Sequence, residues 1–275
     1  MKAQMSMLEK EWLEHTMVTR VPLVLLICGL VMLFSIVMNS TIQTNITYEL
    51  TYSDGFESRF ELGKQVSNVV FLFAGLISML LTGLYFPKTL RKERQEGSLM
   101  FWRSMPVSDM TIHGVKLAFG LLAIPVICSM LVVSADLLMW VMNASLGGNF
   151  PLFETGESFF YIFTHWFEFI GRMWLVGLAL APLAMVSLAI SQKVNSPLLV
   201  MTVALFVAQL LSSTVLGTSL VGDFINDVFR IPFEVLTMEN PLVGFANAGA
   251  MNVLVYALIG AAGLLVSLRL AKFAD

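Results

Sequence analysis

The sequence predicts an all-α integral membrane protein with six transmembrane helices in one membrane domain that covers residues 1–275. The chain is 57% hydrophobic and only 13% charged, and its mean hydropathy is +0.81. A soluble domain is roughly 25% charged, so this composition excludes one. A helix needs roughly 20 apolar residues to cross the hydrocarbon of a bilayer. Six segments meet that need: residues 21–38, 66–86, 117–142, 173–190, 197–217 and 250–268.

The basic residues indicate how these spans are oriented. Six spans place both termini on one side, and most of the 16 lysine and arginine residues fall on that side. They are Lys2, Lys10, Arg20, Lys88, Arg91, Lys92, Arg94, Arg103, Lys116, Lys193, Arg269 and Lys272, against Arg59, Lys64, Arg172 and Arg230 on the other. Because basic residues favour the cytoplasm, we expect cytoplasmic termini and a plasma membrane, with a bacterial inner membrane as the expected type. Nothing in the net charge of −3 suggests nucleic acid.

Residues 1–20 precede the first span and form an amphipathic pattern. Met5, Leu8, Trp12 and His15 recur at helical spacing, while Glu9, Lys10, Glu11 and Glu14 take the other face. Such a helix lies in the membrane interface. Two interpretations stay open, an elbow helix that frames the protein and a simple N-terminal anchor.

A charged segment, residues 87–116, joins the second and third spans on the cytoplasmic side. Pro87 is expected to end the second span, and residues 88–96 are rich in helix formers. Gly97 is expected to end or bend that helix, and Pro106 to stop the turn that follows. Ser108 or Asp109 can then cap the helix that enters the third span. The pattern predicts a helix-break-helix that protrudes from the membrane.

The residue order in this segment carries a family resemblance. An acidic-basic pair, Glu93 and Arg94, is followed by Gly97-Ser98-Leu99 and then by Pro106-Val107-Ser108. This order closely resembles the cytoplasmic coupling segment of type-2 ABC exporter permeases. The resemblance implies that these eight residues engage a separate ATPase subunit, with Glu93 and Arg94 pairing with charges on that partner or with the neighbouring end of the N-terminal helix.

The last outer segment, residues 219–249, holds two apolar stretches that are too short to span. They are residues 228–235 and 242–248, and Pro232 and Pro241 are expected to break them. Such stretches are better interpreted as re-entrant or interfacial. The order Asn240-Pro241-Leu242 also resembles the family, in which short helices before the final span form an outer gate. Asn240, Pro241, Leu242 and Phe245 are therefore gate or pathway candidates. Farther upstream, residues 143–172 are rich in aromatic side chains and predict an interfacial helix that runs into the fourth span.

Asp136 is the one ionisable residue inside the six predicted spans. Carboxylates are costly in a membrane and are functional candidates by default. Three roles stay open for Asp136: a structural pair with Arg172, a substrate or gate role, and proton coupling. His15, His113 and His165 are scattered, with His165 expected in the outer segment, and no metal site or catalytic arrangement is predicted. Cys28 and Cys128 are expected to be packing residues.

The function that these observations predict is the membrane-spanning permease subunit of an ATP-driven exporter. The chain has no Gly-x-x-x-x-Gly-Lys-Ser/Thr phosphate loop, so we expect no ATPase activity and no cofactor of its own. The resemblance implies ATP and Mg²⁺ on two copies of a separate ATPase subunit, and a second permease subunit that is identical or related. The expected substrate is amphipathic. The alternatives are a secondary transporter and an intramembrane transferase.

Overall fold

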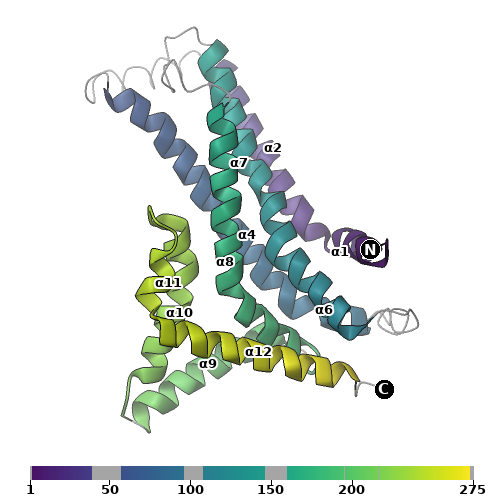
Figure 1. The fold of residues 1–275 in the computed structure, drawn as a ribbon. Coiled ribbons are helices and arrows are strands. Elements are labelled where there is room, and N and C mark those ends of the chain that lie inside the picture. Colours follow the sequence, from purple (N-terminus) through teal and green to yellow (C-terminus); the bar gives the residue numbers. More distant parts are fainter. Residues whose placement is uncertain are drawn as a thin grey trace. The chain divides into compact units, whose positions relative to one another are not determined.

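The computed structural model describes residues 2–38, 57–95, 108–145, 160–194, 196–215 and 217–272. Across these residues the chain is helical and contains no strand (Figure 1). The helices are α1 (Lys2–Glu14), α2 (Thr16–Met38), α4 (Glu57–Gln95), α6 (Asp109–Ala118), η1 (Phe119–Ala123), α7 (Ile124–Ser145), α8 (Phe160–Ser191), α9 (Pro197–Thr214), α10 (Leu220–Thr237), α11 (Val243–Ala248) and α12 (Ala250–Lys272). The prediction of an all-α fold is confirmed for the described residues.

Within the residues that the structure describes, five stretches of helix are long and apolar enough to cross a membrane. They are Val66–Glu93, Asp109–Val141, Phe160–Ser191, Pro197–Thr214 and Ala250–Lys272. A sixth is obtained only when α1 and α2, which are separated by a break at His15, are taken together as one broken span. These apolar helices make the chain a candidate multi-pass membrane protein.

The sequence predicts that Pro87 and Pro232 interrupt their helices, but neither does. Pro87 lies inside α4, which runs on to Gln95, and Pro232 lies inside α10, which runs on to Thr237. Each proline is buried. A proline removes one backbone hydrogen bond and costs roughly 3 kcal/mol in an isolated helix, but packing against neighbours can outweigh that cost. α4 and α8 also begin well before the apolar residues that mark the second and fourth spans, so polar and aromatic residues extend both helices.

The described residues divide into two compact units. The first, unit 1, comprises Met1–His15, Met79–Ile124 and Arg172–Asp275, and the second, unit 2, comprises Thr16–Ser78 and Pro125–Gly171. In unit 2, side chains of α4, α7 and α8 form the buried core, which includes Phe71, Val132 and Phe169. Cys128 is buried in this unit and Cys28 is exposed, and both are free thiols.

Unit 1 is held together by close helix contacts at small residues. A Cβ atom on Gly260 of α12 would come within 2.5 Å of Cα of Pro182, and one on Gly263 would come within 2.9 Å of Val186. The absence of side chains at these two positions lets α12 lie directly on α8. η1 is a π-helical turn, and the carbonyl of Gly120 within it accepts a hydrogen bond from the Thr82 hydroxyl at 3.0 Å.

Candidate functional site

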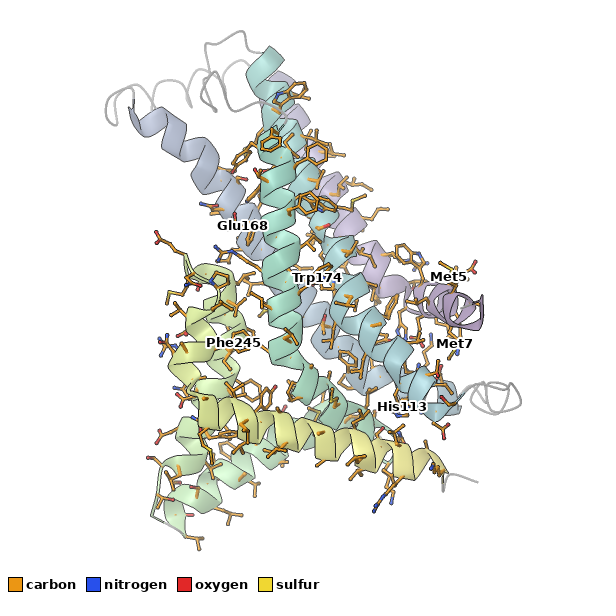
Figure 2. The ribbon with its side chains drawn as sticks, viewed as in Figure 1. Met5, Met7, His113, Glu168, Trp174 and Phe245 are labelled. Carbon is orange, nitrogen blue, oxygen red and sulfur yellow. The ribbon has the colours of Figure 1, made fainter. Side chains whose placement is uncertain are left out.

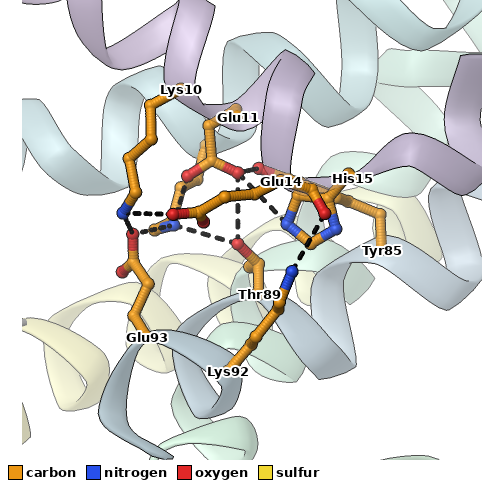
Figure 3. A network of polar contacts seen from close by, with 9 residues as sticks. Lys10, Glu11, Glu14, His15, Tyr85, Thr89, Lys92 and Glu93 are labelled. Atoms are coloured by element: carbon orange, nitrogen blue, oxygen red, sulfur yellow. Dashed lines mark hydrogen bonds and ion pairs between the residues drawn. The ribbon is translucent and has the colours of Figure 1, made fainter. Parts of the chain in front are cut away.

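Three helices bring a buried charge network together in unit 1, beside the predicted coupling segment. α1 contributes Lys10 and Glu11, and α6 contributes Lys116. On α4 the polar residues Tyr85, Thr89 and Glu93 are four residues apart, so they line one face of that helix. We call the set of Lys10, Glu11, Tyr85, Thr89, Glu93 and Lys116 the charge network; Figure 3 shows its contacts.

Lys116 lies at the centre of the charge network and is only 1% exposed. Its Nζ donates to Oε1 of Glu11 at 2.5 Å and to Oγ1 of Thr89 at 2.9 Å. Oε1 of Glu93 lies 3.0 Å from the same nitrogen. An ammonium group has three protons to donate, and this lysine has three acceptors within reach. Its charge is therefore fully partnered inside the protein.

Glu11 is 3% exposed and accepts from several donors at once. The Tyr85 hydroxyl donates to its Oε2 at 2.7 Å, and Nε2 of His15 lies 3.4 Å from the same oxygen. Burial by itself raises the pKa of a carboxyl, but the His15 and Lys116 hydrogen bonds and the Lys116 charge outweigh burial here. Together they hold the pKa of Glu11 well below its usual range. Glu11 is therefore an anion that the fold stabilises.

Lys10 completes the charge network at its edge. Its Nζ donates to Oε1 of Glu93 at 2.7 Å and lies 3.3 Å from Glu14 (Figure 3). Burial lowers the pKa of Lys10, but the hydrogen bonds and charges of Glu93 and Glu14 more than offset it, so the pKa is raised. Lys92 on α4 also donates to the Glu14 carbonyl at 2.9 Å. The end of α1 is therefore tied to the end of α4 by side chains of both helices.

The charge network can transmit displacement among three helices. Its core holds two carboxylates and two ammonium groups, so its net charge is zero. Removing one partner of a buried ion pair costs about 3–5 kcal/mol, because the other charge is left buried without compensation. The end of α4 that precedes residues 96–107 and the last turn of α6 are thus fixed to each other and to α1. A force on either end would act on all three helices.

The sequence-predicted coupling residues fall at the edges of this network or outside the described residues. Glu93 is 4% exposed and pairs with Lys10 of α1, one of the two kinds of partner expected for it. The backbone of Arg94 is helical, but its side chain lies outside the described residues, as do Gly97, Ser98, Leu99, Pro106 and Val107. Ser108 is the N-cap of α6, and its hydroxyl accepts from the Thr111 amide at 3.3 Å.

A second polar cluster in unit 1 joins α6 to α12 and to the end of α8. The Asp109 carbonyl can only accept, so Nδ1 of His113 donates to it at 2.8 Å. In a neutral ring Nε2 then accepts, and the Ser267 hydroxyl lies 2.8 Å away. Gln192 donates to that hydroxyl at 2.7 Å. His113 is thus a packing residue of α6 that fixes the C-terminal helix (Figure 2).

The candidate gate residues lie in a helical hairpin formed by α10 and α11 (Figure 1). α11 packs closely on α10, because a Cβ atom on Gly244 would meet the Ile231 carbonyl at 3.1 Å. In the turn, Oδ1 of Asn240 accepts from the Leu242 amide at 3.0 Å. Leu242 is 57% exposed. Pro241 lies in the turn itself, and Phe245 is half-buried on α11 (Figure 2).

Arg172 clamps this hairpin from α8. Its guanidinium donates to the carbonyl oxygens of Val235 at 3.2 Å, Met238 at 2.5 Å and Glu239 at 3.1 Å. The last carbonyl groups of a helix have no partner within the helix, and a cation near them is favourable. Arg172 supplies both the hydrogen bonds and the charge at the end of α10.

The predicted pair between Asp136 and Arg172 is wrong. Asp136 is 1% exposed and pairs instead with His165, whose Nδ1 lies 2.7 Å from Oδ2. Ser67 donates to Oδ1 of Asp136 at 2.6 Å. His165 was expected in an outer connecting segment, but α8 begins at Phe160 and carries His165 into the core of unit 2. The hydroxyl of Ser67 lies 3.3 Å from Nδ1 of the ring, not near Nε2, so the three residues are not arranged to activate a nucleophile.

No group of three or more histidine, cysteine, aspartate or glutamate residues within the described part of the chain is placed to hold a metal ion. Comparisons with known protein families, with curated proteins and with solved structures found no match to this chain.

Proposed function

We propose that this chain is the permease subunit of an ATP-driven exporter, and that residues 94–108 are its contact with a separate ATPase. The observation that carries the proposal is the charge network. A contact that drives a membrane protein must pass movement from a soluble partner into helices. The two helices that flank residues 96–107 are held by buried ion pairs, and the same ion pairs hold α1.

The residue order supports the same assignment. Gly97-Ser98-Leu99 and Pro106-Val107-Ser108 stand between α4 and α6, in the order that resembles the coupling segment of type-2 ABC permeases. The proposal assigns Glu93 to the internal network, where it links Lys10 and Lys116. Arg94 and the residues up to Ser108 then remain as the contact with the ATPase.

The hairpin of α10 and α11 is the proposed outer gate. Neither helix is among the candidate spans, and α10 carries Asp223, Asp227, Arg230 and Glu234. Amphipathic helices of this kind lie at an interface or line a watery cavity. In the proposed cycle, ATP binding by the partner displaces α4, α6 and α1, and the hairpin opens for an amphipathic substrate. A second permease subunit and two ATPase copies complete the proposed complex.

The test is purification from native membranes in a mild detergent. The proposal expects a co-purified protein whose sequence contains a phosphate loop, and ATP hydrolysis that follows that protein. Replacing both Glu93 and Arg94 by Ala should weaken co-purification or separate hydrolysis from export. The control replaces Lys88, which is exposed on the same helix, by Ala and should change neither. Hydrolysis by the chain alone, or normal export by the double variant, would contradict the proposal.

A further inference from the structure

The cluster of Ser67, Asp136 and His165 lies in the core of unit 2 and includes none of the residues of the charge network. α4, α7 and α8 each supply one member, and the three side chains are 0%, 1% and 6% exposed. Asp136 accepts one hydrogen bond at each carboxyl oxygen, from the Ser67 hydroxyl and from Nδ1 of His165. Neither of these two hydrogen bonds comes from a lysine or an arginine.

The charge of this cluster needs an explanation. With an ionised Asp136 and a neutral His165 the cluster would carry one negative charge inside a candidate membrane span. Such a charge is costly unless a cation compensates it. Among the charged side chains that the structure describes, His165 is the partner of Asp136. The other groups that contact this pair are Ser67, Phe71 and Tyr161, which are uncharged at neutral pH. Glu168, on the same helix as His165, is exposed.

The surroundings of the imidazole favour a positive charge on it. The ring of Tyr161 is stacked on it at 5.4 Å between ring centroids, and the ring of Phe71 lies 5.1 Å away at a low tilt of 31°. Faces of aromatic rings attract cations within about 6 Å. The second ring nitrogen, Nε2, is buried and has no hydrogen-bond partner among the described residues. A free nitrogen of this kind can take up a proton.

We propose that the cluster of Ser67, Asp136 and His165 is a proton-binding site. One proton beyond those of a neutral histidine and an ionised aspartate is held on His165 or shared with Asp136, and it makes the cluster neutral. Ser67 orients the carboxylate, and Asp136 orients the ring through Nδ1. The site is independent of the ATPase contact, so it stands whether or not the chain belongs to an exporter.

The experiment measures the proton directly in the purified chain in detergent micelles at about pH 8, where a solvated histidine is neutral. Nuclear magnetic resonance of ¹⁵N-labelled histidine reports whether both ring nitrogens carry hydrogen. Infrared absorption reports the carbonyl stretch of a protonated carboxyl group. The His165 signal is identified by its loss in His165→Gln. If that variant does not fold, His15→Gln with His113→Gln leaves His165 as the one histidine.

Either of two results in the natural sequence would support the proposal that the cluster holds a proton. His165 carries hydrogen on both nitrogens, or a protonated-carboxyl band is present that Asp136→Asn abolishes. In the first case Asp136→Asn should also return the ring to its neutral form, because the counter-charge is lost. Ser67→Ala is the matched control and should keep the proton. A neutral His165 ring together with no carboxyl band would overturn the proposal.

Discussion

Replacing Lys116 by Met tests the charge network most sharply. Met keeps the length and most of the volume of the side chain but removes the ammonium group that joins Glu11 to Glu93. While α1 stays packed on α4 and α6, Glu11 is then buried without its nearest cation. Loss of one partner of a buried pair costs about 3–5 kcal/mol, and release of α1 returns Glu11 to water. We therefore expect release of α1 to become easier by at least about 3 kcal/mol.

The assay is thiol labelling at Met7, which lies on the inner face of α1 and is 6% exposed (Figure 2). A Met7→Cys chain with Cys28 and Cys128 replaced by Ser is labelled only when α1 is released. Since 1.4 kcal/mol is a factor of ten, Lys116→Met should raise the labelling rate at least about 100-fold. Lys88→Met, at an exposed position on α4, is the control and should leave it unchanged.

A second variant separates the ion pair from general damage. Glu11→Gln combined with Lys116→Met removes both charges, so the double variant should recover part of the loss seen in Lys116→Met. Rates for Lys116→Met and Lys88→Met that agree within about threefold, in a folded protein, would show that the ion pairs do not hold α1. The mechanical link in the proposed function would then fail.

Three further outcomes follow from the structure. The pKa of Glu11 is lowered in the folded state, so this carboxylate stabilises the fold above pH 4.5, the usual pKa of a glutamate, and the stabilisation is lost as the pH falls below that value. Thermal unfolding at a series of pH values should therefore show a stability difference between the natural sequence and Glu11→Gln that shrinks only below pH 4.5. Gly249 has a φ of +80°, so Gly249→Ala should cost about 1–3 kcal/mol of stability, whereas Gly83→Ala, where a Cβ meets open space, should not destabilise α4. Arg172→Gln should increase thiol labelling of the hairpin, and exchanging the charges of Asp136 and Arg172 should recover no stability, because Asp136 pairs elsewhere.

Helix content was predictable because it follows from composition and apolar run length. Each of the five candidate spans overlaps a segment that hydropathy predicts. Helix ends were less predictable, because a buried proline such as Pro87 or Pro232 can be accommodated by neighbouring helices. The apolar run at residues 21–38 was predicted to span by itself, but α2 counts as part of a span only together with α1.

The charge network left a signal in the sequence that is visible once the helix is known. Tyr85, Thr89 and Glu93 recur every four residues on α4, which places a polar stripe on an otherwise apolar helix. Their partners could not be identified from spacing, because Glu11 and Lys116 come from distant parts of the chain. In the sequence Lys116 is one more cytoplasmic basic residue. Packing of α1 and α4 against α6 is what places it between Glu11 and Glu93.

The sequence identifies Asp136 as a costly charge but does not identify its partner. The predicted partner, Arg172, rests on depth in the membrane, whereas the observed partner, His165, depends on which face of α8 packs on α7. Arg172 and His165 are seven residues apart on α8, about two turns. The helix begins earlier than hydropathy suggests, which brings His165 into the core. Arg172 then contacts the carbonyl oxygens at the end of α10, a role that no residue pattern in the sequence could indicate.

In the proposed function, residues 94–108 contact an ATPase whose movement enters through α4, α6 and α1. A photo-crosslinking amino acid at Leu99, in the native membrane, tests it most directly, with Leu258 on the exposed surface of α12 as the control position. We expect Leu99 to capture a phosphate-loop protein and Leu258 not to capture one, and we expect trapped ATP to change the yield. Equal capture from both positions, or none from Leu99 in membranes that export normally, would contradict it.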